Sequence, residues 1–272
     1  MPTKRLKLNS ICKEVIELTH EVGDFILKEK DKFNPSDIQK KGFNDLVSYV
    51  DKTSEKKLIK GLQKILPGSG ILGEEGGGNF DNKYTWVIDP LDGTTNFIHR
   101  LPCFAISIGL FENKTPIIGV VNELNFKECF SAIKGKGAKV NGMKISVSPQ
   151  KQLGDSLIAT GFPYNDFGLQ KEYMQLFEEL MKCTQGLRRI GSAAVDLCYV
   201  AMGRFEAFYE YGLKPWDVSG GALIVQEAGG KLCDFSGGDD YIFGKSIVAS
   251  NGHLHKPFMK IVKRHFNGKN IA

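Results

Sequence analysis

The sequence predicts an α+β fold, in which helices and an antiparallel sheet come first and strands alternate with helices afterwards. Three observations lead to this prediction. Apolar residues recur at helical spacing near the N-terminus, β-rich runs separated by turn residues fill the middle of the chain, and strand-like and helix-like runs alternate after residue 150. With 272 residues, the chain can bury a complete core without outside help.

Two amphipathic helices open the predicted fold. The first covers Ile11 to Ile26, where apolar residues recur every three or four positions. Residues 33–43 contain a proline and a glycine but no clear period, so we expect a loop there that could act as a mobile flap. The second helix starts from Asp45 and stops at Pro67-Gly68. One face carries Leu58, Leu62, Ile65 and Leu66, and the early acids Asp45 and Asp51 are expected to cap the helix.

Strands follow these helices. Ile71 to Gly73 is a short strand that leads into Glu74-Glu75 and three glycines. Tyr84 to Ile88 is aromatic and β-branched, and Pro90 is expected to end its pairing because proline has no N–H group. Three more β-rich runs separated by turn residues predict an antiparallel meander over 104–111, 117–122 and 128–133.

A turn-rich segment at residues 134–142 predicts the boundary between an N-terminal half, 1–140, and a C-terminal half, 141–272, of one catalytic unit. The second half alternates strands with helices. We expect strands at 156–160, 187–190 and 205–209, and helices at 169–181, 193–202 and 218–227.

Composition excludes several classes of protein. No apolar stretch is as long as a membrane span, and the N-terminus lacks a secretory signal, so we expect a cytoplasmic protein with no membrane partner. The six cysteines form no Cys-x-x-Cys pair, which predicts buried free thiols. The net charge of +5 is mild and dispersed. It suits anionic small molecules and argues against a nucleic-acid ligand.

The stretch Trp86 to Phe97 contains the strongest candidates for metal-binding and phosphate-binding residues. Asp89 and Asp92 stand at the predicted strand exit, and Gly93-Thr94-Thr95 can open a helix whose free N–H groups face an anion. Mg²⁺ prefers oxygen ligands and commonly binds one or two carboxylates together with substrate phosphate oxygens. The pair alone leaves two interpretations open: a metal site, or an Asp92 that only caps the helix.

Two other acidic stretches also have two interpretations. Glu74-Glu75 is either solvated or relieved of its mutual repulsion by a cation. Asp217 follows Lys214-Pro215-Trp216 in the first turn of a helix, where it either complements the helix dipole or serves as a ligand.

These stretches together resemble the inositol monophosphatase family. The resemblance rests on three blocks and spans nearly the whole chain, including 45–51 and 191–194. The blocks are Gly73-Glu74-Glu75, Asp89 to Phe97, and Trp216-Asp217 ahead of Glu227-Ala228-Gly229-Gly230. The resemblance implies a layered α-β-α-β-α sandwich of the inositol monophosphatase and fructose-1,6-bisphosphatase type. It also implies a Mg²⁺-dependent, lithium-sensitive hydrolase of phosphate monoesters that forms homodimers.

The same resemblance implies a set of metal ligands. Glu74, Asp89 and the backbone carbonyl of Leu91 would hold one ion. Asp89, Asp92 and Asp217 would hold a second, and a third, weaker ion would lie near Glu74. Mn²⁺ would substitute for Mg²⁺, whereas Li⁺ or Ca²⁺ would inhibit. Two such ions clamp a phosphate and acidify the attacking water.

The remaining roles implied by the resemblance concern water and substrate. Thr94, with Asp51 behind it, would orient or deprotonate the water together with Glu74. The amides of Gly93, Thr94 and Thr95 would bind phosphate oxygens. Substrate contacts would come from Asp92, Gly191, Ser192, Ala193, Glu210 and Asp217.

Relatives of this kind act on inositol 1-phosphate, on fructose 1,6-bisphosphate, or on 3′(2′),5′-bisphosphate nucleotides. The sequence favours the first. The nucleotidases tend to have Lys-Glu where Thr95-Asn96 stand. Lys214-Pro215 before Trp216 resembles the bacterial branch, and Gly203-Arg204-Phe205 places a large cation where many members have small residues, which leaves the choice of substrate open. A hypothesis of another class is a protein that binds the RNA-handling machinery, a role attributed to some bacterial members.

Overall fold

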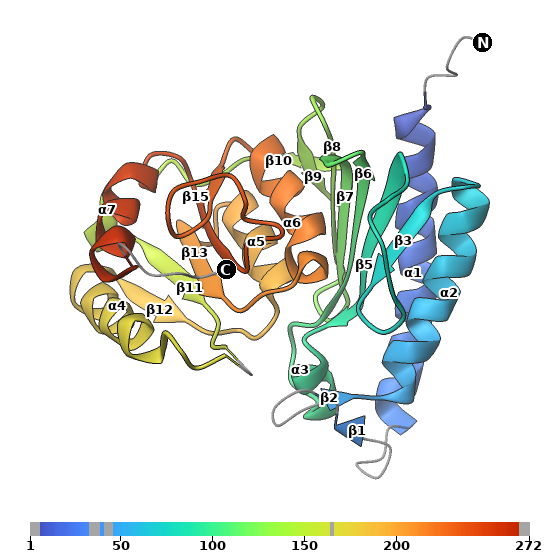
Figure 1. Ribbon diagram of the computed structural model, residues 1–272, viewed down its shortest axis with the longest axis horizontal. Coiled ribbons are helices and arrows are strands. Elements are labelled where there is room, and N and C mark those ends of the chain that lie inside the picture. Colours follow the sequence, from blue (N-terminus) through green and yellow to red (C-terminus); the bar gives the residue numbers. More distant parts are fainter. Residues whose placement is uncertain (1–5, 33–38, 41–45, 164–165, 267–272) are drawn as a thin grey trace.

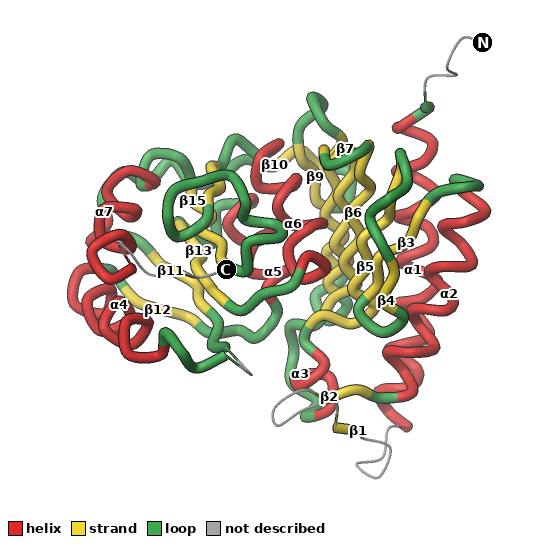
Figure 2. Tube along the Cα trace, in the orientation of Figure 1, coloured by secondary structure: helices red, strands yellow, loops and turns green. Residues whose placement is uncertain are grey.

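Five alternating layers of helices and sheets build the molecule, as Figures 1 and 2 show. The computed structural model describes residues 6–32, 39–40, 46–163 and 166–266. Helices form the two outer layers and the central layer, and a sheet lies on each side of the centre. The layers contain α1 (Leu8–Lys32) and α2 (Tyr49–Ile65), then an eight-stranded sheet, then α5 (Ala193–Ala201) and α6 (Pro215–Glu227), then a five-stranded sheet, and last α4 (Gln170–Cys183) and α7 (His255–Phe266). This arrangement confirms the predicted layered α+β sandwich.

The first outer layer agrees with the predicted helices except at one boundary. Helix α1 buries Ile11, Val15, Val22 and Ile26 against the large sheet. The second helix begins later than expected, at Tyr49, because Leu46–Val47 forms a strand, β2, that pairs antiparallel with β1 (Gln39–Lys40). Asp45 and most of the predicted flap lie outside the described residues. Asp51 caps α2 as expected, within a capping box with Ser48.

The large sheet confirms the predicted meander and extends it. Strands β5 to β9 are connected in order by antiparallel pairing, β10 adds to β9 at one edge, and β3 and β4 lie at the other. The segment predicted to consist of turns therefore contains a strand, β9. The strands are β3 (Gly70–Gly73), β4 (Gly77–Gly78), β5 (Tyr84–Asp92), β6 (Ala105–Glu112), β7 (Thr115–Glu123), β8 (Glu128–Ile133), β9 (Ala138–Val140) and β10 (Met143–Ile145).

Strand β5 does not end before Pro90, so this prediction is wrong. Asp89 pairs with Ser107, and Asp92 pairs with Ala105, so β5 has one residue more than β6 across this interval. Such a bulge tolerates a proline because the extra residue makes no ladder hydrogen bond. As a result, Asp89 and Asp92 lie on either side of an irregular step within one continuous strand.

The second sheet confirms the predicted alternation of strands and helices. Strand β11 (Leu157–Thr160) pairs parallel with β12 (Gly186–Arg188) and β13 (Ala207–Tyr211). Two strands that were not predicted, β14 (Lys231–Cys233) and β15 (Ser246–Ser250), complete the sheet by antiparallel pairing. Helices α4 and α7 bury its outer face.

Helix α6 touches the backbone of the large sheet. A Cβ atom on Gly119 of β7 would overlap the carbonyl oxygen of Gly220, and one on Gly220 would crowd Ser107 and Val120. Glycines on both surfaces therefore allow the helix to pack without intervening side chains. This contact fixes the first turn of α6, which carries Asp217, relative to β5.

Two other predictions concern the whole chain. All six cysteines are free thiols, and five of them are buried, as expected. Among the residues that the structure describes, no helix is both long and apolar enough to cross a membrane.

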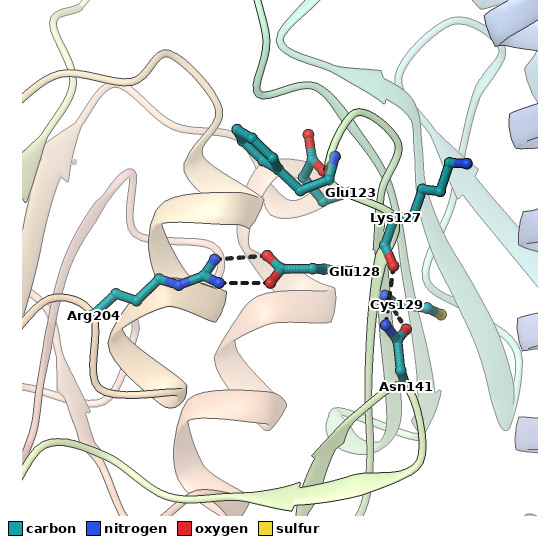
Figure 3. A network of polar contacts seen from close by, with 7 residues as sticks. Glu123, Lys127, Glu128, Cys129, Asn141 and Arg204 are labelled. Atoms are coloured by element: carbon teal, nitrogen blue, oxygen red, sulfur yellow. Dashed lines mark hydrogen bonds and ion pairs between the residues drawn. The ribbon is translucent and has the colours of Figure 1, made fainter.

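A bidentate ion pair joins the central helices to the large sheet (Figure 3). Both terminal nitrogens of Arg204, which follows α5, lie 2.6 Å from the carboxylate oxygens of Glu128 at the start of β8. The guanidinium carbon lies 4.4 Å from the centroid of the Tyr199 ring. In the turn between β9 and β10, Asn141 accepts a hydrogen bond from Cys129 N and donates one to Lys127 O. The contacts of Arg204 thus anchor the chain just after α5 to the start of β8.

We predict that Arg204→Ala will destabilise the protein by about 1–2 kcal/mol, because a bidentate pair stacked on an aromatic ring exceeds an ordinary surface pair. Urea unfolding measures the difference. Lys182→Ala is the matched control, because Lys182 forms an exposed pair with Glu178 on α4; its loss should cost at most about 0.5 kcal/mol. Equal effects of the two substitutions would contradict the prediction.

Candidate active site

All the predicted site residues except Asp51 line one pocket of about 410 Å³. The pocket forms where the end of β5 meets the first turns of α3 (Thr94–Ile98), α5 and α6. The loops that follow β11 and β13 complete the wall. Its lining includes Glu74, Asp89, Leu91, Asp92, Gly93, Thr94, Thr95, Gly191, Ser192, Ala193, Glu210 and Asp217. The structure brings these residues together, and their individual roles stay predictions.

Asp89 lies at the centre of the negative charge. The residue is 2% exposed, and Leu91 N donates a hydrogen bond of 2.9 Å to its Oδ1 atom. Burial raises the pKa of Asp89 well above the usual value, and the charges of Glu74, Asp92 and Asp217 raise it further. An ionised Asp89 is therefore costly here unless a cation balances the charge.

Asp92 caps a helix, but not the expected one. The N-cap of α3 is Gly93, with φ of 91° and no side-chain cap. Instead, Asp92 Oδ2 accepts hydrogen bonds from Ser192 Oγ at 2.6 Å and from Ala194 N at 2.7 Å. Burial raises the pKa of Asp92 to about 6, although these two contacts oppose the rise. Asp92 thus ties β5 to the start of α5.

Thr94 and Asp51 form a hydrogen-bonded pair. Thr94 Oγ1 lies 2.9 Å from Asp51 Oδ1 and 3.0 Å from the carbonyl oxygen of Leu91. Asp51 is 1% exposed, does not line the pocket and lies behind Thr94. Its Oδ2 atom accepts hydrogen bonds from Ser48 N and Ser48 Oγ, while burial raises its pKa. Asp51 therefore combines the helix-capping role with a contact that orients the threonine hydroxyl.

Asp217 and Glu74 reach the pocket from opposite halves of the chain. Asp217 Oδ2 accepts a hydrogen bond of 2.7 Å from Lys214 N, so the expected helix-start contact is present. Glu74 follows β3, and its N–H donates to Ile88 O on β5. Both side chains are half-buried.

Glu210 forms the deep wall of the pocket. It lies on β13, is 6% exposed, and has a pKa raised by burial and then by the charge of Asp217. A Cβ atom on Gly161 would overlap its carboxyl group. The glycine therefore makes room for this acid.

Sequence reasoning missed several lining residues. Asp196 on α5 is 1% exposed, and burial followed by the charges of Glu210 and Asp92 raises its pKa well above the usual value. A signal existed, since Asp196 is the lone charged residue in the apolar run 193–201, one turn after Ser192. The cations of the lining, Arg189, Lys214 and Lys245, gave no such signal.

The donor set fits hard divalent cations in its chemistry. Among the described residues, no three acidic, histidine or cysteine side chains form a ready-made metal-binding group. The carboxylates of Glu74, Asp92 and Asp217 nevertheless lie close enough to raise the pKa of Asp89. Oxygen donors under mutual repulsion are the ligands that Mg²⁺ favours, and ion binding would draw them together.

Fold and pocket together define a layered α+β sandwich with one pocket lined by several acidic side chains. A family model provides a sharper assignment, because the model of the inositol monophosphatase family matches residues 7–266. The chain belongs to the inositol monophosphatase family.

Individual relatives cover almost all of the chain. "Nus factor SuhB" of Pseudomonas aeruginosa is 39% identical over 256 residues, which span 92% of this chain and 94% of the relative. "Phosphatase IMPL1, chloroplastic" of Arabidopsis thaliana is 42% identical over 255 residues, or 91% of this chain and 68% of the relative. The crystal structure of extragenic suppressor protein suhB from Bartonella henselae has a TM-score of 0.89 at 34% identity, covering 94% of this chain and 99% of that chain. These three relatives are named a Nus factor, a phosphatase and an extragenic suppressor protein.

Proposed function

We propose that this protein hydrolyses phosphate monoesters with the help of Mg²⁺, and that inositol 1-phosphate is its best substrate. The observation that carries the proposal is the convergence of Glu74, Asp89, Asp92 and Asp217 on one pocket. Family membership supports the same reaction class. We also propose that the protein acts in the cytoplasm as a homodimer and is inhibited by lithium.

In this proposal the acidic side chains hold the cations. Glu74, Asp89 and the carbonyl of Leu91 would hold one ion, and Asp89, Asp92 and Asp217 would hold another. A third, weaker ion would lie near Glu74. Bound there, the ions would balance the charge of the phosphate and stabilise the leaving alkoxide. Mn²⁺ would substitute for Mg²⁺, and Ca²⁺ would inhibit because it prefers more ligands at longer distances.

The chain's own groups position the phosphate and the attacking water. The N–H groups of Gly93, Thr94 and Thr95 at the start of α3 bind phosphate oxygens. Thr94 Oγ1, held by Asp51 and the Leu91 carbonyl, orients the water together with Glu74. Contacts to the alcohol part of the substrate come from Asp92, Gly191, Ser192, Ala193, Glu210 and Asp217.

A substrate panel tests the proposal. Purified protein with Mg²⁺ should release phosphate from inositol 1-phosphate with a higher kcat/KM than from fructose 1,6-bisphosphate or adenosine 3′,5′-bisphosphate. EDTA should abolish the activity, excess Mg²⁺ should restore it, and lithium should lower it. If no phosphate is released from any of the three esters with Mg²⁺ or Mn²⁺, the proposal is wrong; a preference for the nucleotide would reassign the substrate.

A second candidate function is binding to the RNA-handling machinery. The relative named a Nus factor, at 39% identity, favours it. Genetic complementation separates the two functions. If an inactive Asp89→Asn protein fully restores a deletion phenotype, binding is the main role. Asp89 is the better probe here, because Asp92 also caps α5.

A further inference from the structure

One residue of the pocket lining has a buried carboxyl oxygen without a hydrogen-bond partner. In the described part of the chain, four buried side-chain polar atoms lack a partner: Ser54 Oγ, Trp86 Nε1, Tyr209 OH and Asp196 Oδ1. Of these residues, Asp196 is the one that lines the pocket. Burying a polar atom without a partner costs free energy, so such atoms are rare in folded proteins. At a binding site, the ligand can supply the missing partner.

The surroundings of Asp196 favour a neutral hydrogen-bond donor as that partner. Asp196 lies one helical turn after Ser192 on α5, so it shares the face of the helix that meets the substrate. Glu210 and Asp92 add negative charge nearby, and Arg189 adds positive charge. This mixture disfavours another anion, and the phosphate is expected at α3 instead. Hydroxyl groups, by contrast, donate to carboxyl oxygens of either protonation state.

The size of the pocket fits a hydroxylated ring. Its volume of about 410 Å³ lies in the range typical of small-molecule sites. Glu210, to which Gly161 gives room, provides a second buried carboxyl group on the same wall. A phosphate bound at Gly93 to Thr95 therefore leaves space for an alcohol part next to two acids.

We propose that Asp196 binds a hydroxyl group of the substrate and makes the pocket selective for esters of polyols over esters of plain alcohols. This inference rests on the proposed phosphatase function and deepens it. A site built to bind a hydroxyl group discriminates strongly against an analogue that lacks it, because the buried group is then left unpaired.

Two esters with the same ring test the inference: inositol 1-phosphate and cyclohexyl phosphate, which lacks the ring hydroxyls. Asp196→Ala should lower kcat/KM for inositol 1-phosphate by about 10-fold or more, mostly through KM, and change it for cyclohexyl phosphate by less than about twofold. Asp196→Asn, which keeps an oxygen acceptor, should restore most of the loss. A proportional loss for both esters, or for neither, would overturn the inference.

Stability provides the second measurement. Asp196 Oδ1 has no partner to lose, so Asp196→Ala should unfold at a temperature no lower than the wild type does. A large drop, or failure to fold, would assign Asp196 a structural role and contradict the inference. Ser54→Ala is the matched control, since it removes an unpartnered buried oxygen outside the pocket and should not change the ratio between the two esters. If the wild type hydrolyses neither ester, both the proposed function and this inference are wrong. If the wild type is active but Asp196→Ala leaves the ratio of kcat/KM for the two esters unchanged, only the inference is wrong.

Discussion

Asp89→Asn is expected to lower the rate of phosphate-ester hydrolysis by at least about 1,000-fold while the protein stays folded. Asp89 is the acid that the proposal assigns to both ions, and it is the most deeply buried of the four. The asparagine keeps an Oδ1 atom that can accept the hydrogen bond from Leu91 N. The substitution therefore removes a charge and leaves the local contact in place. Steady-state phosphate release at saturating Mg²⁺ measures the effect.

The same variant should be more stable than the wild type when divalent ions are absent. The pKa of Asp89 is raised in the folded protein, so folding favours its protonated form. That contribution is complete below the pKa of an unfolded carboxyl, about 3.9, and is lost as pH rises through the folded-state pKa. Asparagine does not titrate. The Tm of Asp89→Asn should therefore exceed that of the wild type by a margin that grows from acidic to neutral pH. Each kcal/mol of difference in unfolding free energy corresponds to about 2–4 °C.

Magnesium should reverse this order of stability. An ion that binds only the folded wild type stabilises it by about 2.7 kcal/mol at one hundred times its Kd, and the variant should gain little. Asp155→Asn is the control, because Asp155 is an exposed acid outside the pocket and should change neither activity nor the response to magnesium. Normal turnover by Asp89→Asn, or equal stabilisation of both proteins by magnesium, would contradict the assignment.

Thr94→Ala is expected to lower kcat by about 100- to 1,000-fold with little change in KM, because its hydroxyl orients the attacking water and does not hold the ester. The hydroxyl lies between Asp51 Oδ1 and the Leu91 carbonyl, so its direction is fixed on the protein side. Thr94→Ser keeps the hydroxyl and should retain activity within about 10-fold. Phosphate release over a range of substrate concentrations separates the two constants.

The substitution Asp51→Asn tests whether Asp51 acts by orienting the hydroxyl of Thr94. If Asp51 acts through the threonine, its substitution should lower kcat in the wild type but add little in the Thr94→Ala background. Additive losses would show that Asp51 acts independently. A Thr94→Ala protein with normal kcat, or with a loss confined to KM, would disprove the proposed role of the hydroxyl.

The periodicity of apolar residues in the sequence predicted much of the fold, because long amphipathic helices and the strands of the β-meander bury one face against a neighbour. Short edge strands carry no such pattern. β14 and β10 have three residues each, and their existence depends on a neighbouring strand with free edge groups. Local rules also failed at Pro90, where a bulge in the pairing with β6 accommodates the residue that was expected to end the strand.

The candidate site was predicted to the extent that its residues stand in a recognisable motif. Asp89 to Thr95 is contiguous, and its two acids lie in the last four residues of strand β5. By contrast, the cap that Asp92 provides reaches Ala194, 102 positions away, and no local pattern indicates it. Arg189, Lys214 and Lys245 come from three separate loops. Only the folded chain shows that they line the same pocket.

The contact between Gly220 and Gly119 has a consequence for how substrate choice can diversify. Any side chain introduced there would push Asp217 away from Asp89. Substitutions at this interface should therefore lower activity in every protein with this fold. Changes in substrate preference should arise instead at the rim of the pocket, in the loops that contain Phe162, Leu213 and Lys245. A library randomised at these rim positions should yield new preferences among esters, whereas one randomised beneath α6 should yield mostly inactive clones.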